Sequence, residues 1–154
     1  MTAEGPAAEA ELDRFLARFT PAVEASARAA LARMRACVPG ATELVYDNYN
    51  ALAIAFGAND KRSGILFSIA VSPRWVSLFF SRGPELPDPH GLLKGEGTTV
   101  RHIVLSEPDL IDTPPVRALI AEGLERATPP VDPAQPRRLI IKSVAAKQRS
   151  RRPG

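Results

Sequence analysis

Apolar residues recur every three or four positions in the first part of the chain, a spacing typical of one buried helix face. They are Leu12, Phe15, Leu16, Phe19, Val23, Ala27, Leu31, Met34 and Val38. Pro21 interrupts the run, and Thr20 before it suits an N-cap followed by a first helical residue. The pattern therefore predicts two consecutive helices over residues 9–19 and 21–37, the second ended by Pro39 and Gly40.

The hydrophobic period changes to two after Gly40. In residues 51–56 large apolar side chains alternate with alanine, which predicts a strand with one buried face. Residues 65–71 and 75–80 form two further apolar runs, separated by short polar turns. Because connections this short exclude crossovers, we expect the three strands to form an antiparallel meander.

A long loop follows, and residues 100–105 then predict a fourth strand. Apolar spacing over residues 116–124 predicts another helix, with Thr113 as its N-cap. A proline-rich linker leads to residues 137–144, which can add a last short strand. This order predicts an α+β fold. It is a two-layer sandwich, an antiparallel sheet of about four to five strands with helices packed on one face.

The net charge of +3 is distributed unevenly. Residues 137–154 hold seven basic residues and no acid: Arg137, Arg138, Lys142, Lys147, Arg149, Arg151 and Arg152. The excess of positive charge therefore belongs to the end of the chain and is no evidence that the folded body binds nucleic acid. We expect one domain over residues 1–136. After it come a short apolar segment and a basic, disordered tail, within residues 137–154.

The single cysteine, Cys37, excludes a disulfide within the chain and is expected to act as a small core residue at a helix end. The acidic N-terminal stretch lacks the apolar core of a signal peptide. No apolar run approaches the roughly 20 residues of a membrane span. These features predict a cytoplasmic protein that does not contact membranes.

Residues 90–105 read HGLLKGEGTTVRHIVL and contain a lysine beside two glycines. A dinucleotide site needs a third small residue, where this chain has Val100, and a helix after the loop, where a strand is predicted. The order of a P-loop is absent as well, because Lys94 precedes the glycines. A turn leading into a strand is the favoured interpretation.

Arg101 and His102 are neighbours on the predicted fourth strand, where successive side chains point to opposite faces. His102 is a candidate acid–base group, with Arg101 or Lys94 as an anion anchor, although a single histidine on a strand is more often structural. The other histidine, His90, lies in a loop. Because two histidines without a ligand-spacing motif do not predict a metal site, we expect no metal and no cofactor.

Residues 46–50, YDNYN, are the densest polar and aromatic patch. Tyr46, Asn48 and Tyr49 are candidates for the mouth of a pocket, offering rings and amide groups. The alternative is a turn, because Asp and Asn favour bends. Trp75 can stack on a ligand or pack at a sheet edge.

The order of VPGATELVYDNYNALAIAFG, a hairpin, HGLLKGEGTTVRHIVL and a final helix resembles the YdhG-like family of small uncharacterised bacterial domains. The resemblance covers about residues 12–127. It implies a frataxin-like fold, with helices on one face of an antiparallel sheet.

By analogy with frataxin, the resemblance also raises an iron- or metal-chaperone role. Frataxin-like iron binding uses an acidic ridge on the first helix, since iron favours oxygen ligands. Here Glu9, Glu11 and Asp13 are interleaved with arginines, starting with Arg14 and Arg18. This composition speaks against an iron site.

Taken together, the sequence favours a non-enzymatic domain that binds a small ligand or a protein partner. The candidate ligand-binding residues are Tyr46, Asn48, Tyr49, Lys94, Arg101 and His102. An enzyme that uses His102 and Arg101 is an alternative, as is a metal chaperone. A further alternative is low-affinity nucleic-acid binding by the basic tail, through Lys147, Arg149, Arg151 and Arg152.

Overall fold

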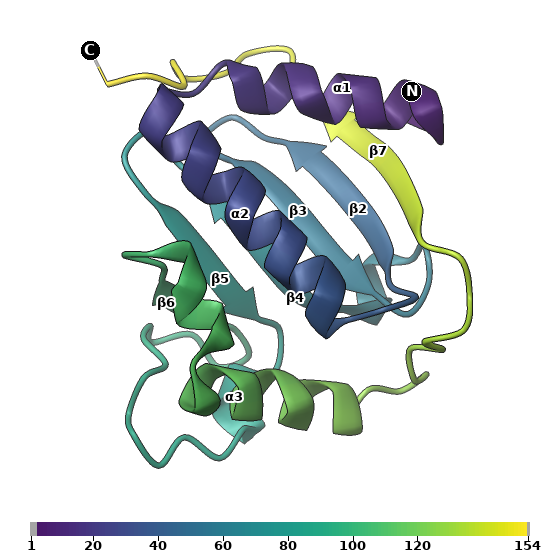
Figure 1. The fold of residues 1–154 in the computed structure, drawn as a ribbon, viewed down its shortest axis with the longest axis vertical. Coiled ribbons are helices and arrows are strands. Elements are labelled where there is room, and N and C mark those ends of the chain that lie inside the picture. Colours follow the sequence, from purple (N-terminus) through teal and green to yellow (C-terminus); the bar gives the residue numbers. More distant parts are fainter. Residues whose placement is uncertain (1–2, 154) are drawn as a thin grey trace.

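The computed structural model describes residues 3–153, and three α-helices lie within that range (Figure 1). Helix α1 spans Pro6–Ala17, α2 spans Pro21–Cys37 and α3 spans Pro114–Glu125. The three predicted helices are therefore confirmed, although α1 begins and ends two to three residues earlier than expected.

The helix starts show how local sequence sets these boundaries. Thr20 caps α2, because its Oγ1 accepts a hydrogen bond of 3.4 Å from the backbone N–H of Val23. Thr113 occupies the N-cap position of α3 as predicted, but its hydroxyl donates to the carbonyl of Leu110 instead of capping the helix.

Seven strands form a single sheet within residues 3–153. Their bounds are β1 Ala3–Glu4, β2 Thr42–Asp47, β3 Leu52–Gly57, β4 Ile65–Val71, β5 Val76–Phe80, β6 Arg101–Val104 and β7 Arg138–Val144. The strand order is β1-β7-β2-β3-β4-β5-β6. Neighbouring strands are antiparallel except β2 and β7, which are parallel.

The prediction of an antiparallel sheet of four to five strands is wrong in strand number and in type, although the α+β class is confirmed. Strand β2 was not predicted because Glu43 and Asp47 share its helix-facing side with Val45, which breaks the apolar alternation. The chain reaches β7 through a long connection that includes α3. Such a crossover allows β7 to run parallel to β2.

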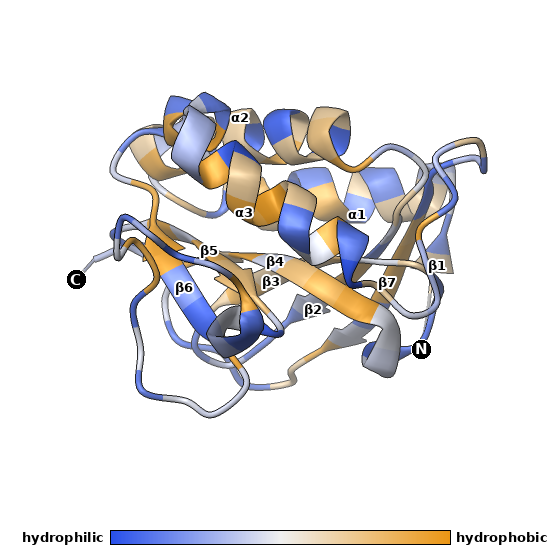
Figure 2. Cartoon of the chain, turned by 90° about the horizontal axis from the view of Figure 1, so that it is seen from below, coloured by the Kyte–Doolittle hydropathy of each residue, from blue (hydrophilic) through white to orange (hydrophobic). Residues whose placement is uncertain are grey.

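All three helices lie on the same side of the sheet, as Figure 2 shows. The strand residues that face them form the main core: Val45, Ile54, Phe56, Phe67, Ile69, Leu78, Phe80, Ile103, Leu139 and Ile141. The opposite side of the sheet carries no α-helix within the described residues. No helix of residues 3–153 is long and apolar enough to cross a membrane.

A buried carboxylate joins the helix layer to the sheet. Glu43 of β2 is 1% exposed and accepts two short hydrogen bonds from Arg35 of α2, at 2.8 and 2.9 Å. Arg137 approaches Glu43 at 3.4 Å and also donates to Glu9 of α1 at 2.8 Å. Burial of Glu43 therefore depends on arginines from two other segments.

A second buried ion pair fixes the end of the chain. Arg151 is 3% exposed, and its Nη2 donates to Asp47 Oδ1 at 2.7 Å and to the carbonyl of Asn48 at 2.6 Å. The guanidinium also lies 5.8 Å from the centre of the Phe19 ring. The structure thus contradicts the expectation of a disordered tail up to residue 153, because a buried carboxylate at position 47 requires a charged partner.

Most of residues 137–144 form strand β7, which lies between β1 and β2 inside the sheet. Leu139, Ile140 and Ile141 are all buried. This part of the chain is therefore integral to the body, so a domain boundary at residue 136 does not separate two structural units.

Candidate functional site

The predicted ligand-binding residues fall into two groups that lie far apart across the sheet. Across the strands the register runs Leu44–Ala55–Ser68–Phe79–His102, and in the next row Tyr46–Ala53–Ala70–Ser77–Val104. These ten residues form the face opposite the helices, which we call the open face. Because four strand spacings of about 4.8 Å separate Tyr46 from His102, the two side chains are roughly 19 Å apart and share no site.

Tyr46 is covered and not at the mouth of a pocket. The ring is 8% exposed and packs in a small cluster with Leu44, Ala55 and Ile140. The guanidinium of Arg62, in the connection between β3 and β4, lies 5.0 Å above the ring.

Arg101 and His102 point to opposite faces of β6, as strand alternation predicts. His102 stacks on Phe79 of β5 with ring centres 5.0 Å apart. Arg101 instead donates to the carbonyl of Gly97 at 2.8 Å. Arg101 therefore does not lie beside His102 as the anion anchor that one form of the enzyme alternative predicts.

Lys94 adds backbone pairing to the edge of the sheet. Its N–H donates to the carbonyl of His102 at 2.8 Å, and the N–H of His102 donates back at 3.0 Å. The LLKGEG stretch is thus a segment that pairs with β6, with Gly95 at a φ of 110° that favours glycine. No helix N-terminus follows it to face a phosphate group.

Asn48 and Tyr49 contribute their backbones to the docking of the C-terminal residues. The carbonyl of Tyr49 accepts from the N–H of Arg149 at 3.0 Å, and that of Asn48 accepts from Arg151. The side chains of both residues remain exposed, with Tyr49 at 45%.

This docking creates a pocket of about 470 Å³ between the β4–β5 turn and the C-terminal residues. Its lining combines Trp75 with three arginines and small or polar neighbours: Asn50, Ser72, Pro73, Arg74, Trp75, Arg149, Ser150, Arg152 and Pro153. Trp75 is 52% exposed. No acidic residue lines the pocket.

The arginines of this pocket keep uncompensated charge. Arg149 donates to the amide oxygen of Asn50 at 3.4 Å, and Arg152 donates to the carbonyl of Arg18 at 3.2 Å. Both acceptors are neutral, and Arg74, Arg149 and Arg152 form no ion pair within residues 3–153. The pocket can therefore attract an anion and offer a ring to stack on.

Of the four predicted nucleic-acid contacts, the structure brings two to this pocket, Arg149 and Arg152. Lys147 is exposed but does not line the pocket. Arg151 is buried and forms an ion pair with Asp47, so it cannot contact phosphate in this arrangement.

The acids of the first helix are engaged in ion pairs. Glu11 pairs with Arg14, Asp13 with Arg28, and Glu9 with Arg137. The part of the chain that the structure describes holds no group of three or more metal-ligating side chains.

Cys37 does not provide an activated nucleophile. Burial raises the pKa of its thiol, and the effect of Asp112 adds to this, although Arg117 acts in the opposite direction. Because the thiolate is the reactive form, Cys37 is less reactive than an exposed cysteine at neutral pH.

Sequence reasoning considered Trp75 and the tail arginines separately and did not place them together. Residues 72–75 and 149–153 are far apart in the chain, and no local spacing relates them. The available signal was Asp47, one of two acids in the buried strand β2, which required a basic partner.

Comparisons with protein-family models, with curated proteins and with solved structures return no match. The resemblance to the YdhG-like family stays a prediction.

Proposed function

We propose that this chain is a non-enzymatic binding protein whose ligand combines an anionic group with a planar ring. The observation that carries the proposal is the pocket in which Trp75, Arg74, Arg149 and Arg152 converge without an acid. Guanidinium groups suit phosphate and carboxylate, because their N–H donors match the geometry of these anions. A half-exposed indole suits stacking with a ring.

The other proposals have less geometric support. A metal chaperone would need oxygen ligands that the ion pairs of Glu9, Glu11 and Asp13 already engage. For catalysis by His102, one candidate anion anchor, Arg101, lies on the other face of β6, whereas the second, Lys94, is paired with His102 on the same face.

Calorimetric titration with adenosine 5′-monophosphate, adenosine and inorganic phosphate tests the proposed function. We expect the monophosphate to bind more tightly than either fragment, since it alone offers both the ring and the anion. Replacing Arg149 and Arg152 by glutamine should weaken its binding at least about tenfold, because each charge-assisted hydrogen bond contributes about 1.5–3 kcal/mol.

Two control variants distinguish the effect of the pocket arginines on binding from a general effect of removing positive charge. Lys147→Gln removes a positive charge from the same segment but outside the pocket, and Lys94→Ala removes one from the glycine-rich loop. Both should leave binding of the monophosphate unchanged. Binding that is lost in Lys94→Ala and kept in the double arginine variant would assign the ligand to the loop and refute the proposal.

A further inference from the structure

The open face continues from the pocket across the sheet and is built of small side chains. Its central positions are Ala53, Ala55, Ser68, Ala70 and Ser77. Sheets whose second face is permanently packed carry large aliphatic residues there, as the helix-facing side of this sheet does. Of these small residues, Ala55 and Ser77 are buried, and Ala53, Ser68 and Ala70 are half-buried.

Aromatic rings stand along β5 on this face. Phe79 lies on this face beside His102. Trp75 comes immediately before β5, and because side chains alternate along a strand, it points to the face opposite the core residue Val76. Four residues of extended chain separate Trp75 and Phe79 by roughly 13 Å. The neighbour of Phe79 on the side away from His102 is Ser68, which has a short side chain, and Phe79 itself is half-buried.

The acids of the helix layer are largely paired. Helices α1, α2 and α3 and the short helix η3 (Pro108–Asp112) carry eight acids, some exposed and some half-buried: Glu9, Glu11, Asp13, Glu24, Asp109, Asp112, Glu122 and Glu125. Several of these pair with arginines of the same layer.

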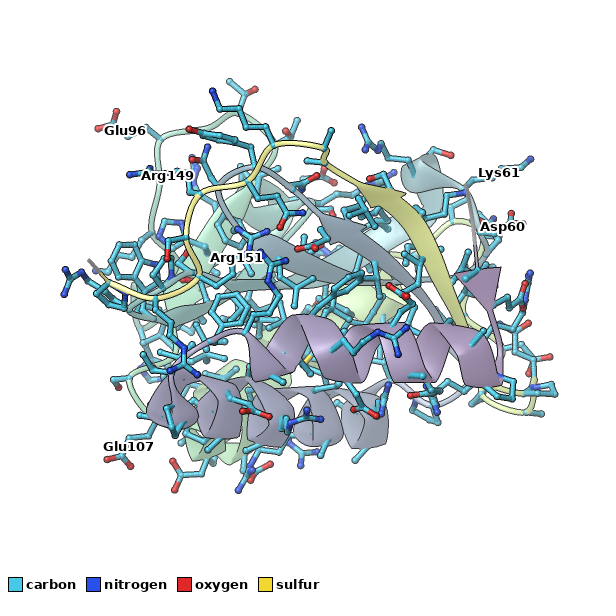
Figure 3. All side chains as sticks on the ribbon, turned by 90° about the horizontal axis from the view of Figure 1, so that it is seen from above. Asp60, Lys61, Glu96, Glu107, Arg149 and Arg151 are labelled. Carbon is cyan, nitrogen blue, oxygen red and sulfur yellow. The ribbon has the colours of Figure 1, made fainter. Side chains whose placement is uncertain are left out.

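Several basic residues around the open face have no ion-pair partner among residues 3–153, although Arg138 of β7 pairs there with Glu4 at 2.7 Å. Arg62 lies over Tyr46, Lys94 pairs through its backbone with His102, and Lys142 donates only to the carbonyl of Asp60. Figure 3 shows Lys61 and Arg149 on this side of the sheet, away from the helices, with Asp60 and Glu96 as the acids labelled there. This side is therefore complementary to an extended polyanion.

We infer that the open face binds single-stranded nucleic acid, with one base on Trp75 and a second on Phe79 and with phosphates on the surrounding arginines and lysines. The inference rests on the proposed function, which it extends from one nucleotide to a strand. Aromatic platforms on an open sheet, combined with a positively charged path for the backbone, are the usual means of binding single strands. A duplex cannot stack its paired bases on these rings.

The test uses fluorescence anisotropy of a labelled oligothymidylate of about eight nucleotides, within the range that one sheet platform covers. We expect the full chain to bind it at least about tenfold more tightly than thymidine monophosphate and more tightly than a duplex of equal length. Phe79→Leu and His102→Gln should weaken oligonucleotide binding several-fold and leave monophosphate binding unchanged, because both residues lie outside the Trp75 pocket.

Arg14→Gln serves as the matched control, since it removes a positive charge from the helix layer, and it should change neither affinity. Thermal unfolding of each variant checks that the sheet remains folded. If the monophosphate binds but the oligonucleotide binds no more tightly, or if Phe79→Leu and His102→Gln bind it normally, the inference fails and the proposed function stands. Equal affinity for the duplex also refutes the inference. If neither ligand binds, both proposals fail.

Discussion

A carboxylate inside a strand, Asp47, determines where the end of the chain lies. It is 1% exposed, and its charge is balanced by Arg151 at 2.7 Å, with Arg18 at 3.5 Å. Removing one partner from a buried pair is costly because the other charge stays uncompensated. The position of the proposed ligand pocket therefore depends on this ion pair, which holds Arg149 and Arg152 beside Trp75.

Asp47→Ala should lower the free energy of unfolding by about 3–5 kcal/mol, because Arg151 would remain buried without its carboxylate. Urea unfolding measures the change. The exposed pair of Glu11 and Arg14 gives a matched control, and Glu11→Ala should cost at most about 1 kcal/mol. Equal losses in the two variants would show that the Asp47 pair contributes no more than a surface pair.

Cys37 offers a prediction about reactivity. Burial raises the pKa of its thiol. The rate of alkylation by iodoacetamide should therefore increase over a higher pH range in the folded chain than in the urea-unfolded chain. Measuring the rate across the alkaline range in both states tests this. A lower midpoint in the folded state would indicate an activated cysteine instead.

At the scale of secondary-structure elements, helix α3 packs closely against the sheet at Gly123. A Cβ atom added to Gly123 would lie 2.7 and 2.9 Å from two ring carbons of the buried Phe67. Gly123→Ala should therefore destabilise the protein by roughly 1–3 kcal/mol from overpacking, offset by about 1 kcal/mol of improved helix propensity.

Thermal and urea unfolding of Gly123→Ala measure the net effect. The reverse exchange at the exposed Ala121 is the comparison, and Ala121→Gly should cost only the propensity of about 1 kcal/mol. A more stable Gly123→Ala variant would mean that the ring of Phe67 moves aside without cost.

The C-terminal elements can be separated by truncation. A chain that ends at Ala145 keeps all seven strands and should fold, although less stably because Asp47 loses Arg151. It also loses Arg149 and Arg152 and so should no longer bind adenosine monophosphate. A chain that ends at Gln135 loses β7 from inside the sheet and should not fold stably. Circular dichroism and unfolding curves distinguish the two, and a stable chain ending at Gln135 would refute the structural role of β7.

The local hydrophobic pattern was sufficient to predict most helices and strands. It could not predict contacts between residues that are far apart in the chain. The apolar periods placed α2 and β4 to the residue, because each buries one regular face. Strand β2 escaped detection because Glu43 and Asp47 lie among its core positions, and their partners come from Arg35, Arg137 and Arg151 elsewhere in the chain. The pocket was not predicted for the same reason, because residues 149–153 meet Trp75 only in the folded structure.

On the scale of the whole molecule, the two layers differ in how their charges are paired. Arginines of the helix layer mostly pair with acids, whereas Arg62, Lys94 and Lys142 near the open face form no ion pair among residues 3–153. An anionic ligand is therefore attracted to one side of the molecule, and the attraction is screened by salt.

The salt dependence of oligonucleotide binding follows from this arrangement. Three pocket arginines, together with Arg62, Lys94 and Lys142 around the open face, allow about three to six phosphate contacts. The slope of log affinity against log salt concentration should then be about −2 to −4 for a single strand. Titrations between low and physiological salt measure it, and a slope near zero would exclude phosphate contacts as a source of affinity.

The most direct measurement of the central claim uses Trp75, which is the single tryptophan of the chain and lies in the pocket. Titration with adenosine 5′-monophosphate should quench its fluorescence saturably, because the adenine ring stacks on the indole. The quenching should weaken at least about tenfold when Arg149 and Arg152 are replaced by glutamine. Fluorescence that stays unchanged on titration, or saturable quenching of equal midpoint in the double variant, would contradict the account.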